Sequence, residues 1–272
     1  EVPMTPLVRR FARSRTPDIP PVRIAYLEKG HPHPLEPSFV AIPGIWEPAE
    51  RARPLLEALE GHALAVSLRG RGESDTPATG YDLAHHVGDL EGVVEAAGVR
   101  KMVLLGFSRG VGYALGFARR HRELLAGLVL VDARPRHSIL PPGRADLWKA
   151  HRVEGRPVTD FIRPEALEGM EREAREVIFW DDLPGFAMPV LVLQGTSPTR
   201  TPPSNLDDAD AARYGELLPR GEVERFENSG HLIPDDEPER YRATVCRFVA
   251  HCRDRIAGSA HLPAGMGVFP TG

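Results

Sequence analysis

The stretch from residue 101 to residue 120 constrains the fold of this chain more than any other part of the sequence. Residues 102–105 form a continuous apolar run, which is typical of a β-strand covered on both faces. Residues 106–110 then read Gly-Phe-Ser-Arg-Gly, and residues 111–120 have helical character. A serine held on a tight turn between a strand and a helix needs small neighbours, which the two glycines supply. The sequence therefore predicts a turn that presents Ser108, with the free N–H groups of the following helix pointing at it.

Strands and helices alternate through most of the remaining chain. This alternation predicts an α/β fold with a doubly wound, mostly parallel sheet. Residues 1–21 are rich in proline and arginine and are expected to form an irregular lead-in, and the chain after residue 258 is expected to be loose. Further strands are predicted at 22–28, 38–42, 62–68, 127–131, 189–195 and 222–226, and helices at 48–59, 81–97, 205–218 and 238–253.

One segment, residues 134–186, breaks this alternation. It is rich in proline, arginine and glutamate and carries scattered aromatic residues. We interpret it as a small helical lid inserted into an α/β core domain formed by residues 1–133 and 187–272. Aromatic side chains of a lid can line an apolar substrate pocket, although they serve as often in plain packing. The candidate pocket residues are Trp46, Trp148, Phe161 and Phe179.

Three polar residues follow predicted strands, where α/β sheets place their ligand sites. A serine hydroxyl is a weak nucleophile and needs a base, for which His231 in the loop after the last strand is the best candidate. A histidine base needs a carboxylate to orient it, and Asp132 directly follows an apolar strand. A structural role remains the alternative for both residues, which for Asp132 means a helix cap or an ion pair with Arg134 or Arg136.

A serine nucleophile also needs hydrogen-bond donors for the oxyanion that forms when it attacks a carbonyl. The backbone N–H groups of Arg109, directly after the serine, and of Ile45, in the loop after the strand at 38–42, are the candidates. Each such donor is typically worth about 2.7–4 kcal/mol in acyl transfer.

Taken together, these motifs resemble those of the α/β-hydrolase superfamily, in particular its compact, lidded serine esterases. The resemblance extends from about residue 22 to residue 249. It is highly specific for the fold and only weakly specific for the substrate. The matching motifs are Phe-Val-Ala-Ile-Pro-Gly at 39–44, Leu-Arg-Gly-Arg-Gly-Glu-Ser-Asp at 68–75, the serine turn at 106–110, the strand at 189–195 and Ser-Gly-His at 229–231.

The chain departs from the family pattern in two places. The oxyanion loop has Pro-Gly at positions 43–44 where the family usually has His-Gly, which leaves the backbone donor in place. Residues 195–200 contain no carboxylate, although most members carry the catalytic acid there. In some relatives the acid follows the preceding strand, and Asp132 matches that position. Asp207 and Asp208 are weaker candidates because they lie within a predicted helix.

The resemblance implies a serine hydrolase that cleaves a small acyl ester, lactone or related bond through an acyl-enzyme, without a cofactor or a metal. A serine in place of aspartate argues against the dehalogenase and epoxide-hydrolase branches. Two alternatives stay open: a binding protein with little turnover, favoured by the missing acid, and acyl transfer or carbon–carbon bond hydrolysis on the same residues. Arg109, Arg134 and Arg136 near the site would suit a carboxylate-bearing substrate.

Composition limits the partners of the protein. The net charge is −4, and no run approaches the roughly 18 apolar residues of a membrane span, so we expect a small-molecule substrate and neither nucleic acid nor a membrane. Cys246 and Cys252 are six residues apart on one predicted helix, which makes a disulfide unexpected and favours a reducing cytoplasm. Residues 1–21 do not read as a secretory signal. The sequence leaves open the oligomeric state and whether a leader preceded Glu1.

Two further features receive no functional assignment from the sequence. The Arg-Gly-Arg-Gly run at residues 69–72 is interpreted as a tight loop at a strand end, because the lysine of a phosphate-binding loop is missing. His85 and His86, on the predicted helix at 81–97, are interpreted as solvent-facing or packing residues.

Overall fold

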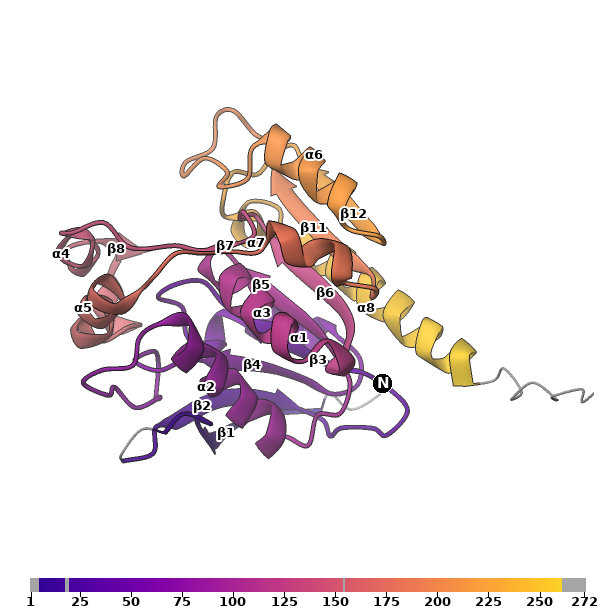
Figure 1. The fold of residues 1–272 in the computed structure, drawn as a ribbon, viewed down its shortest axis with the longest axis horizontal. Helices are drawn as coiled ribbons and strands as arrows, with labels where there is room; N and C mark the ends of the chain where they lie inside the picture. The colour runs from indigo at the N-terminus through magenta and orange to yellow at the C-terminus, as the bar shows by residue number, and fades with distance from the viewer. Residues whose placement is uncertain (1–4, 18–19, 154, 261–272) are drawn as a thin grey trace, which may run out of the picture.

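The computed structural model describes residues 5–17, 20–153 and 155–260, and its centre is an eight-stranded sheet (Figure 1). The strand order is β1-β2-β4-β3-β5-β6-β11-β12. All neighbours from β4 to β12 pair in parallel, whereas β2 is antiparallel to both β1 and β4. The strands are β1 (Leu7–Arg13), β2 (Arg23–Lys29), β3 (Ser38–Ile42), β4 (Ala63–Ser67), β5 (Met102–Phe107), β6 (Leu125–Val131), β11 (Val190–Gly195) and β12 (Gly221–Phe226).

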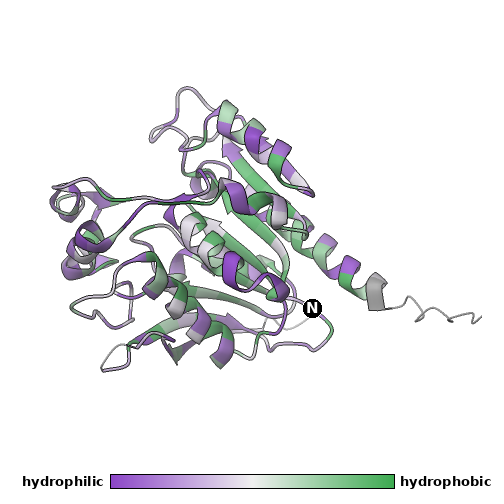
Figure 2. Cartoon of the chain, in the orientation of Figure 1, coloured by the Kyte–Doolittle hydropathy of each residue, from purple (hydrophilic) through white to green (hydrophobic). Residues whose placement is uncertain are grey.

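Helices cover both faces of this sheet, as the alternating sequence predicts. Helices α2, α3 and α6 pack on one face, and α1, α7 and α8 pack on the other. Every residue of β3, β4 and β5 is buried, and Figure 2 shows these central strands as the most hydrophobic part of the fold. The predicted α/β, doubly wound sheet is confirmed. The helices are α1 (Arg53–Ala58), preceded by the 3-10 helix η1 (Ala49–Ala52), α2 (Leu83–Ala96), α3 (Arg109–Arg120), α6 (Asp208–Leu217), α7 (Ile233–Asp236) and α8 (Pro238–Ala260), with a short 3-10 helix η2 (Arg122–Leu124) before β6.

The N-terminal region corrects one prediction. We expected residues 1–21 to be irregular, but Leu7–Arg13 forms strand β1 and pairs with β2 along its whole length. Most β1 side chains are exposed and three are arginines, so the strand lacks the apolar run that marks a buried strand. Charged side chains are typical of an edge strand, where the backbone hydrogen bonds hold the strand in place. Of the tail predicted to be loose, residues 261–272 lie outside the described residues.

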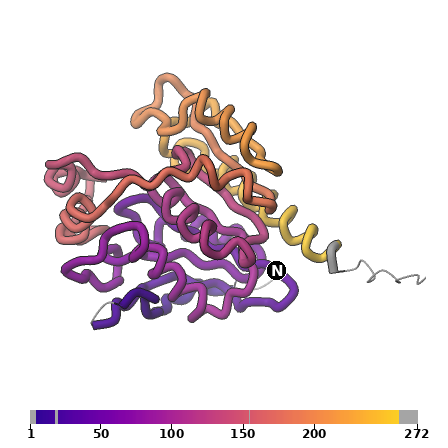
Figure 3. Tube along the Cα trace, in the orientation of Figure 1, coloured from indigo at the N-terminus to yellow at the C-terminus, as the bar shows by residue number. Residues whose placement is uncertain are grey.

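The insertion between β6 and β11 has more strand structure than a helical lid would have. It contains α4 (Arg144–Lys149) and α5 (Pro164–Glu173), but also the antiparallel pairs β7/β10 and β8/β9. Two-residue strands leave no readable periodicity in a sequence, so they were not predicted. Figure 3 shows the two long connections to α4 and α5 running side by side where β7 and β10 pair. Its remaining elements are β7 (Arg136–His137), β8 (Arg152–Val153), β9 (Arg156–Pro157), η3 (Val158–Asp160), β10 (Val177–Ile178) and η4 (Trp180–Gly185).

The insertion is anchored on the loop after β4. The N–H of Arg163 donates to the carbonyl of Gly70 at 2.8 Å, and the N–H of Gly72 donates to the carbonyl of Phe161 at 2.9 Å. Gly70 has a φ of +76°, and a Cβ there would lie 2.3 Å from the Cβ of Ala166 on α5. Only glycine therefore allows this contact, which explains one residue of the Arg-Gly-Arg-Gly run.

The insertion contributes to two separate cores. Its helices α4 and α5 form a small apolar cluster against Tyr81, with Ile45 and Trp46 packed on its edge. The end of the insertion, including Phe179 and η4, packs instead into the main core beside α3. The segment that sequence analysis treated as one unit is thus divided structurally, and its role as a lid stays a prediction.

Two observations concern the whole of the described chain. Cys246 and Cys252 are both free thiols, the first partly exposed and the second buried. Among the described residues, no helix combines the length and the hydropathy that a membrane span requires.

Candidate active site

Ser108 occupies the turn between β5 and α3. Its N–H donates to the carbonyl of Val131 on β6 at 3.0 Å, so the serine extends the sheet by one residue before the chain turns. Its φ is 55° and its ψ −121°, a conformation that costs a non-glycine residue on the order of 1–3 kcal/mol. Such strain persists only where the surrounding structure enforces it, and it is common at functional sites.

The two glycines that flank this turn are required by its close packing. A Cβ on Gly106 would lie 2.4 Å from the carbonyl oxygen of Gly110. A Cβ on Gly110 would lie 2.5 Å from the carbonyl oxygen of Ile42 on β3. Both contacts are far shorter than backbone and side chain tolerate, so the two glycines do provide the room that the sequence pattern indicated.

His231 and Asp132 lie in line with the serine. The Nε2 atom of His231 is 2.9 Å from the Oγ atom of Ser108, and its Nδ1 atom is 2.7 Å from an Oδ2 atom of Asp132. The Asp132 side chain is fully buried, and that of His231 is 12% exposed. A carboxylate can only accept, so the contact assigns the ring proton to Nδ1 and leaves Nε2 as the acceptor for the serine hydroxyl.

The Asp132 carboxylate is held by donors besides the histidine. Oδ1 accepts from the N–H of Gly195 at 2.9 Å and from the hydroxyl of Ser204 at 2.6 Å, while Oδ2 also accepts from the N–H of Asn205 at 2.9 Å. Gly195 ends β11, where most relatives were expected to carry the acid. The end of β11 therefore carries no acid, and its backbone N–H instead donates to the carboxylate of Asp132.

The two arginines considered as partners of Asp132, and the two other candidate acids, have different contacts. Arg134 pairs with Asp207 and Asp210, and Arg136 lies 3.6 Å from Glu176, so neither arginine pairs with Asp132. Asp207 caps α6 by accepting from the N–H of Asp210 at 2.8 Å. Asp208 contacts instead the Gln194 amide at 2.9 Å and Arg225 at 3.1 Å.

Sequence analysis missed the loop that closes over the histidine. The side-chain amide of Asn205 lies 3.1 Å from Nε2 of His231, the same atom that faces Ser108. The backbone N–H of His231 donates to the carbonyl of Pro202 at 2.9 Å. The only sequence signal for these residues is their position between β11 and α6, next to the edge of the sheet where the site lies.

The predicted oxyanion donors, Ile45 and Arg109, follow the neighbouring strands β3 and β5. Arg109 is the first residue of α3, where a helix leaves its N–H without an intrahelical acceptor. The N–H of Ile45 has no acceptor in the described part of the chain. The loop of Ile45 is held from two sides, because the N–H of Gly44 donates to Glu47 at 2.7 Å and the guanidinium of Arg71 donates to the Ile45 carbonyl at 2.9 Å.

Glu47 is an unusual support for a backbone loop because it is largely buried. Burial raises its pKa above the ordinary value, while the charge of Arg51, which lies 2.9 Å away, acts in the opposite direction. A Cβ on Gly44 would lie 2.9 Å from the carboxylate, so the glycine permits this close approach. The hydrogen bond of Glu47 thereby fixes the peptide that precedes the Ile45 donor.

The four aromatic residues proposed for the pocket lie in three different settings. Trp46, beside Ile45, and Trp148 of α4 meet edge to face with ring centroids 5.6 Å apart. Phe161 lies under the guanidinium of Arg156 at 4.5 Å. Phe179 is fully buried in the main core, so the structure places it in packing against the α3 side of the sheet.

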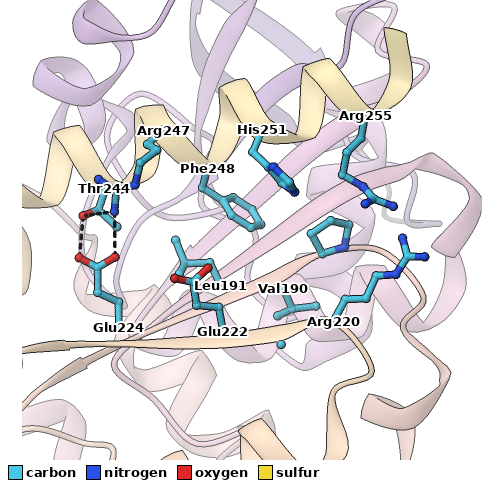
Figure 4. A pocket seen from close by; sticks show the side chains of 12 residues that line it. Val190, Leu191, Arg220, Glu222, Glu224, Thr244, Arg247, Phe248, His251 and Arg255 are labelled. Carbon is cyan, nitrogen blue, oxygen red and sulfur yellow. Dashed lines mark hydrogen bonds and ion pairs between the residues drawn. The ribbon is translucent and has the colours of Figure 1, made fainter. Parts of the chain in front are cut away.

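Two cavities lie outside this arrangement of side chains. The larger, of about 620 Å³, is lined by the first residues of β11 and β12 and by α8 (Figure 4). Ser108 and Asp132 follow the carboxyl ends of their strands, so this cavity lies at the opposite edge of the sheet. A smaller cavity of about 280 Å³ is lined by Pro43, Glu47 and Phe107 and lies beside the oxyanion loop. Among the described residues, no three histidine, cysteine or acidic side chains are grouped as a metal site.

The fold and the site geometry are those of a known class. The model of the alpha/beta hydrolase family matches residues 30–244, which is most of the chain. The protein therefore belongs to the alpha/beta hydrolase family, and this membership supports a hydrolase as its class.

Relatives and solved structures agree with this assignment. A non-heme chloroperoxidase of Streptomyces lividans is 29% identical over 227 residues, which cover 68% of this chain and 80% of the relative. An uncharacterized protein of Mycobacterium tuberculosis is 25% identical over 232 residues, covering 68% of this chain and 67% of that protein. A thermophilic esterase from Thermogutta terrifontis shares the fold with a TM-score of 0.70 at 22% identity, over 90% of this chain and 99% of the esterase.

Proposed function

We propose that the protein is a serine hydrolase that cleaves a small acyl ester, lactone or related bond through Ser108, His231 and Asp132. The observation that carries this proposal is the unbroken contact chain from Asp132 through His231 to Ser108, with distances of 2.7 and 2.9 Å. Both distances are within the reach that proton transfer requires.

The geometry supports an acyl-enzyme mechanism. The Nε2 atom of His231 takes the proton of Ser108 as Oγ attacks the substrate carbonyl. The N–H groups of Ile45 and Arg109 then stabilise the oxyanion, while Asp132 stabilises the imidazolium. The imidazolium returns its proton to the leaving alcohol, and a water molecule, activated by the same histidine, hydrolyses the acyl-enzyme.

The side chain of Asn205 adds one feature to this mechanism. Its amide faces the same Nε2 atom as the serine hydroxyl, at 3.1 Å. In the resting protein the amide and the hydroxyl therefore share one acceptor. Once Nε2 carries the proton it no longer accepts, so the Asn205 amide has to turn its oxygen toward the ring or move away.

A binding protein with little turnover was the main alternative. The absence of an acid in residues 195–200 was the feature that favoured it. Asp132 contacts His231 from the end of β6, so this absence no longer argues against turnover. Acyl transfer and carbon–carbon bond hydrolysis would use the same three residues, and no observation favours either over ester hydrolysis.

The proposal is tested with a fluorophosphonate probe and a series of 4-nitrophenyl esters. The wild-type protein should be labelled at Ser108 and should hydrolyse at least one short ester. Ser108→Ala should abolish labelling and lower kcat by a factor on the order of 10⁶, as loss of the nucleophile does in a serine protease. Ser197→Ala, on an exposed part of the loop after β11, is the matched control and should keep both.

Persistent ester turnover in a folded Ser108→Ala variant would refute the proposal. An unlabelled wild-type protein that hydrolyses none of the esters would favour the binding-protein alternative.

A further inference from the structure

Two arginine side chains lie next to the candidate active site without a carboxylate partner. Arg109 directly follows Ser108, and Arg71 donates to the carbonyl of Ile45, so each arginine is adjacent to one of the two candidate oxyanion donors. No carboxylate of the described residues lies within ion-pair distance of either guanidinium. Of the three arginines first considered for substrate binding, Arg134 and Arg136 are paired with acids and only Arg109 is not.

Arg71 is buried and is contacted by neutral groups. Its side chain is among the largest in the protein that are fully buried. Besides Ile45, its guanidinium donates to the carbonyl of Arg69 at 2.6 Å, to Nε2 of His86 at 3.0 Å and to the sulfur of Met170 at 3.0 Å. Thioether sulfur is a weak acceptor, so the Nη2 atom that faces Met170 is poorly satisfied.

Arg109 is half-buried and also has neutral partners. Its Nε atom donates to the hydroxyl of Tyr113 at 3.0 Å, and its Nη2 atom donates to Nε2 of His137 at 3.0 Å. Its Nη1 atom makes no hydrogen bond within the described residues. Tyr113 joins the two arginine sites, because its ring stacks on His86 with centroids 4.5 Å apart and tilts against His137 at 5.6 Å.

Both histidines are fixed as neutral acceptors. Nδ1 of His86 donates to the carbonyl of Asp82 at 2.7 Å, and Nδ1 of His137 donates to the carbonyl of Arg175 at 2.9 Å. A carbonyl at Nδ1 leaves Nε2 as a lone-pair acceptor for each guanidinium. Burial, and then the charge of Arg109, lowers the pKa of His137 to about 4, and burial lowers that of His86 well below its ordinary value.

The acids around this cluster are already used. Asp89 pairs with the buried Arg69 at 2.7 Å, which neutralises that arginine. Glu173 accepts from the N–H groups of Gly80 and Tyr81, both at 2.7 Å, and from Arg172. Asp82 accepts from His85 at the start of α2. The side chains of Arg71 and Arg109 thus leave two positive charges without a neutralising carboxylate.

A buried charge without a counterion, such as that of Arg71, is strongly unfavourable, and an anionic ligand beside it would supply the opposite charge. We propose that Arg109 binds a second carboxylate of the substrate, that the buried positive charge of Arg71 favours an anion at this site, and that the hydrolase acts on acyl compounds derived from a dicarboxylic acid. The planar guanidinium matches the geometry of a carboxylate, and Nη1 of Arg109 has its donors available. This inference rests on the proposed function and names its substrate class.

In this proposal the two ends of the substrate bind at different places, the ester carbonyl at Ser108 and the carboxylate at Arg109. In the proposed mechanism the Ile45 and Arg109 N–H groups bind the scissile carbonyl, while the guanidinium of Arg71 contacts the carbonyl of Ile45 and that of Arg109 contacts His137 of β7. A carboxylate bound there fixes the acyl chain while the carbonyl meets Ser108. The expected benefit is a lower KM and a more frequent productive orientation for anionic esters.

The test compares anionic and neutral esters of equal chain length. The substrates are the mono-4-nitrophenyl esters of succinic, glutaric and adipic acid, paired with 4-nitrophenyl butanoate, pentanoate and hexanoate. The spontaneous hydrolysis of each ester is subtracted. The readout is the ratio of kcat/KM for the anionic ester over its neutral partner, which cancels effects on the serine itself.

We expect the wild-type ratio to exceed 10 for at least one pair. Arg109→Met should lower this ratio by about 10- to 100-fold, the range for loss of a hydrogen bond to a charged group. Arg109→Lys keeps the charge without the fork and should give an intermediate ratio. Arg136→Met, which removes an exposed arginine of β7 paired with Glu176, is the matched control and should leave the ratio unchanged.

Different failures are distinguishable. Neutral esters turned over faster than every anionic partner would overturn the dicarboxylate inference and leave the serine hydrolase intact. A ratio that Arg109→Met and Arg109→Lys leave at the wild-type value, in variants with the wild-type Tm, would overturn it as well. Absence of both turnover and fluorophosphonate labelling would overturn the proposed function, and this inference with it.

Discussion

The two polar regions next to Ser108 each contain a buried charged side chain, but they differ in the partners that stabilise its charge. In the first, the Asp132 carboxylate accepts from His231, Gly195, Ser204 and Asn205. In the second, the guanidinium of Arg71 is equally buried but has carbonyl, imidazole and thioether partners in place of an anion.

The charge of Asp132 is stabilised by donors within the fold, whereas in this proposal the charge of Arg71 is stabilised only when an anionic ligand binds. A carboxylate with several donors is stable in place and can orient a histidine through many turnovers. A cation with weak partners loses stability in the free protein and regains it when an anion binds. The first region therefore specifies the proposed reaction, and the second specifies the substrate.

The largest expected effect on activity comes from replacing Asp132, the charged side chain that the fold supplies with several donors. Asp132→Asn should lower kcat by a factor on the order of 10⁴, because an amide can donate to Nδ1 and hold the wrong tautomer of His231. Steady-state kinetics with the best 4-nitrophenyl ester measure this effect, and circular dichroism checks the fold. Near-normal turnover of a folded Asp132→Asn variant would mean that Ser108 and His231 work without an acid.

A smaller effect should distinguish two buried arginines that lie two residues apart. Arg69→Met leaves the buried Asp89 carboxylate without its partner, which typically costs about 3–5 kcal/mol. Arg71→Met leaves only neutral acceptors behind and also removes an unpaired charge, so its cost should be smaller by about 2 kcal/mol. Urea unfolding of both variants measures the difference. Equal losses would indicate that Arg71 is compensated by the fold after all.

The smallest effect concerns the pH dependence of stability. His137 has a pKa lowered to about 4 from the ordinary 6.5, so between these values the unfolded chain binds more protons than the folded one. The free energy of unfolding must then fall as the pH falls through this window, by up to about 1.4 kcal/mol per pH unit. His137→Asn removes this contribution and keeps a polar side chain. Urea unfolding at pH 7 and pH 5 should show a loss on acidification that is smaller by about 1–2 kcal/mol in the variant, and an unchanged loss would contradict the assignment.

The sequence predicts most of the sheet because buried parallel strands leave apolar runs. Strands β2 to β6, β11 and β12 lie where the pattern placed them, within about two residues of the expected ends, as is usual for sequence patterns. β1 was missed because an edge strand needs only its backbone to pair, and its arginines gave a loop-like composition. The strand pairs of the insertion were missed because two residues carry no period.

The residues of the candidate site also differ in how well the sequence predicts them. Ser108, Asp132 and His231 each follow a strand, so the topology of the sheet brings them together and a pattern of strand ends could predict it. Their catalytic roles remain proposals. Asn205 and Ser204 could not be predicted in the same way, because a loop without periodicity places them.

The lack of a carboxylate partner for Arg71 could not be predicted from the sequence, for a different reason. Arg71 belongs to a run that was correctly read as a tight loop, but only packing shows that no acid reaches its side chain. His86 was predicted to be solvent-facing or packed, and the structure shows the packed case, in which it is buried and accepts from Arg71. Phe179 illustrates the converse, since an aromatic residue of the insertion proved to be core.

The contacts that join His231 to Asp132 and Ser108 span 99 and 123 residues of sequence. Contacts between such distant parts of a chain form slowly, because a large loop must close before the contact stabilises the fold. Helices and the nearby strands can therefore assemble while the histidine loop, carried by the last strand, is still unplaced. During refolding, reactivity of the serine should return after helix content and tryptophan fluorescence have recovered. Labelling by a serine-directed probe would then report only fully folded molecules, in which His231 already contacts Ser108.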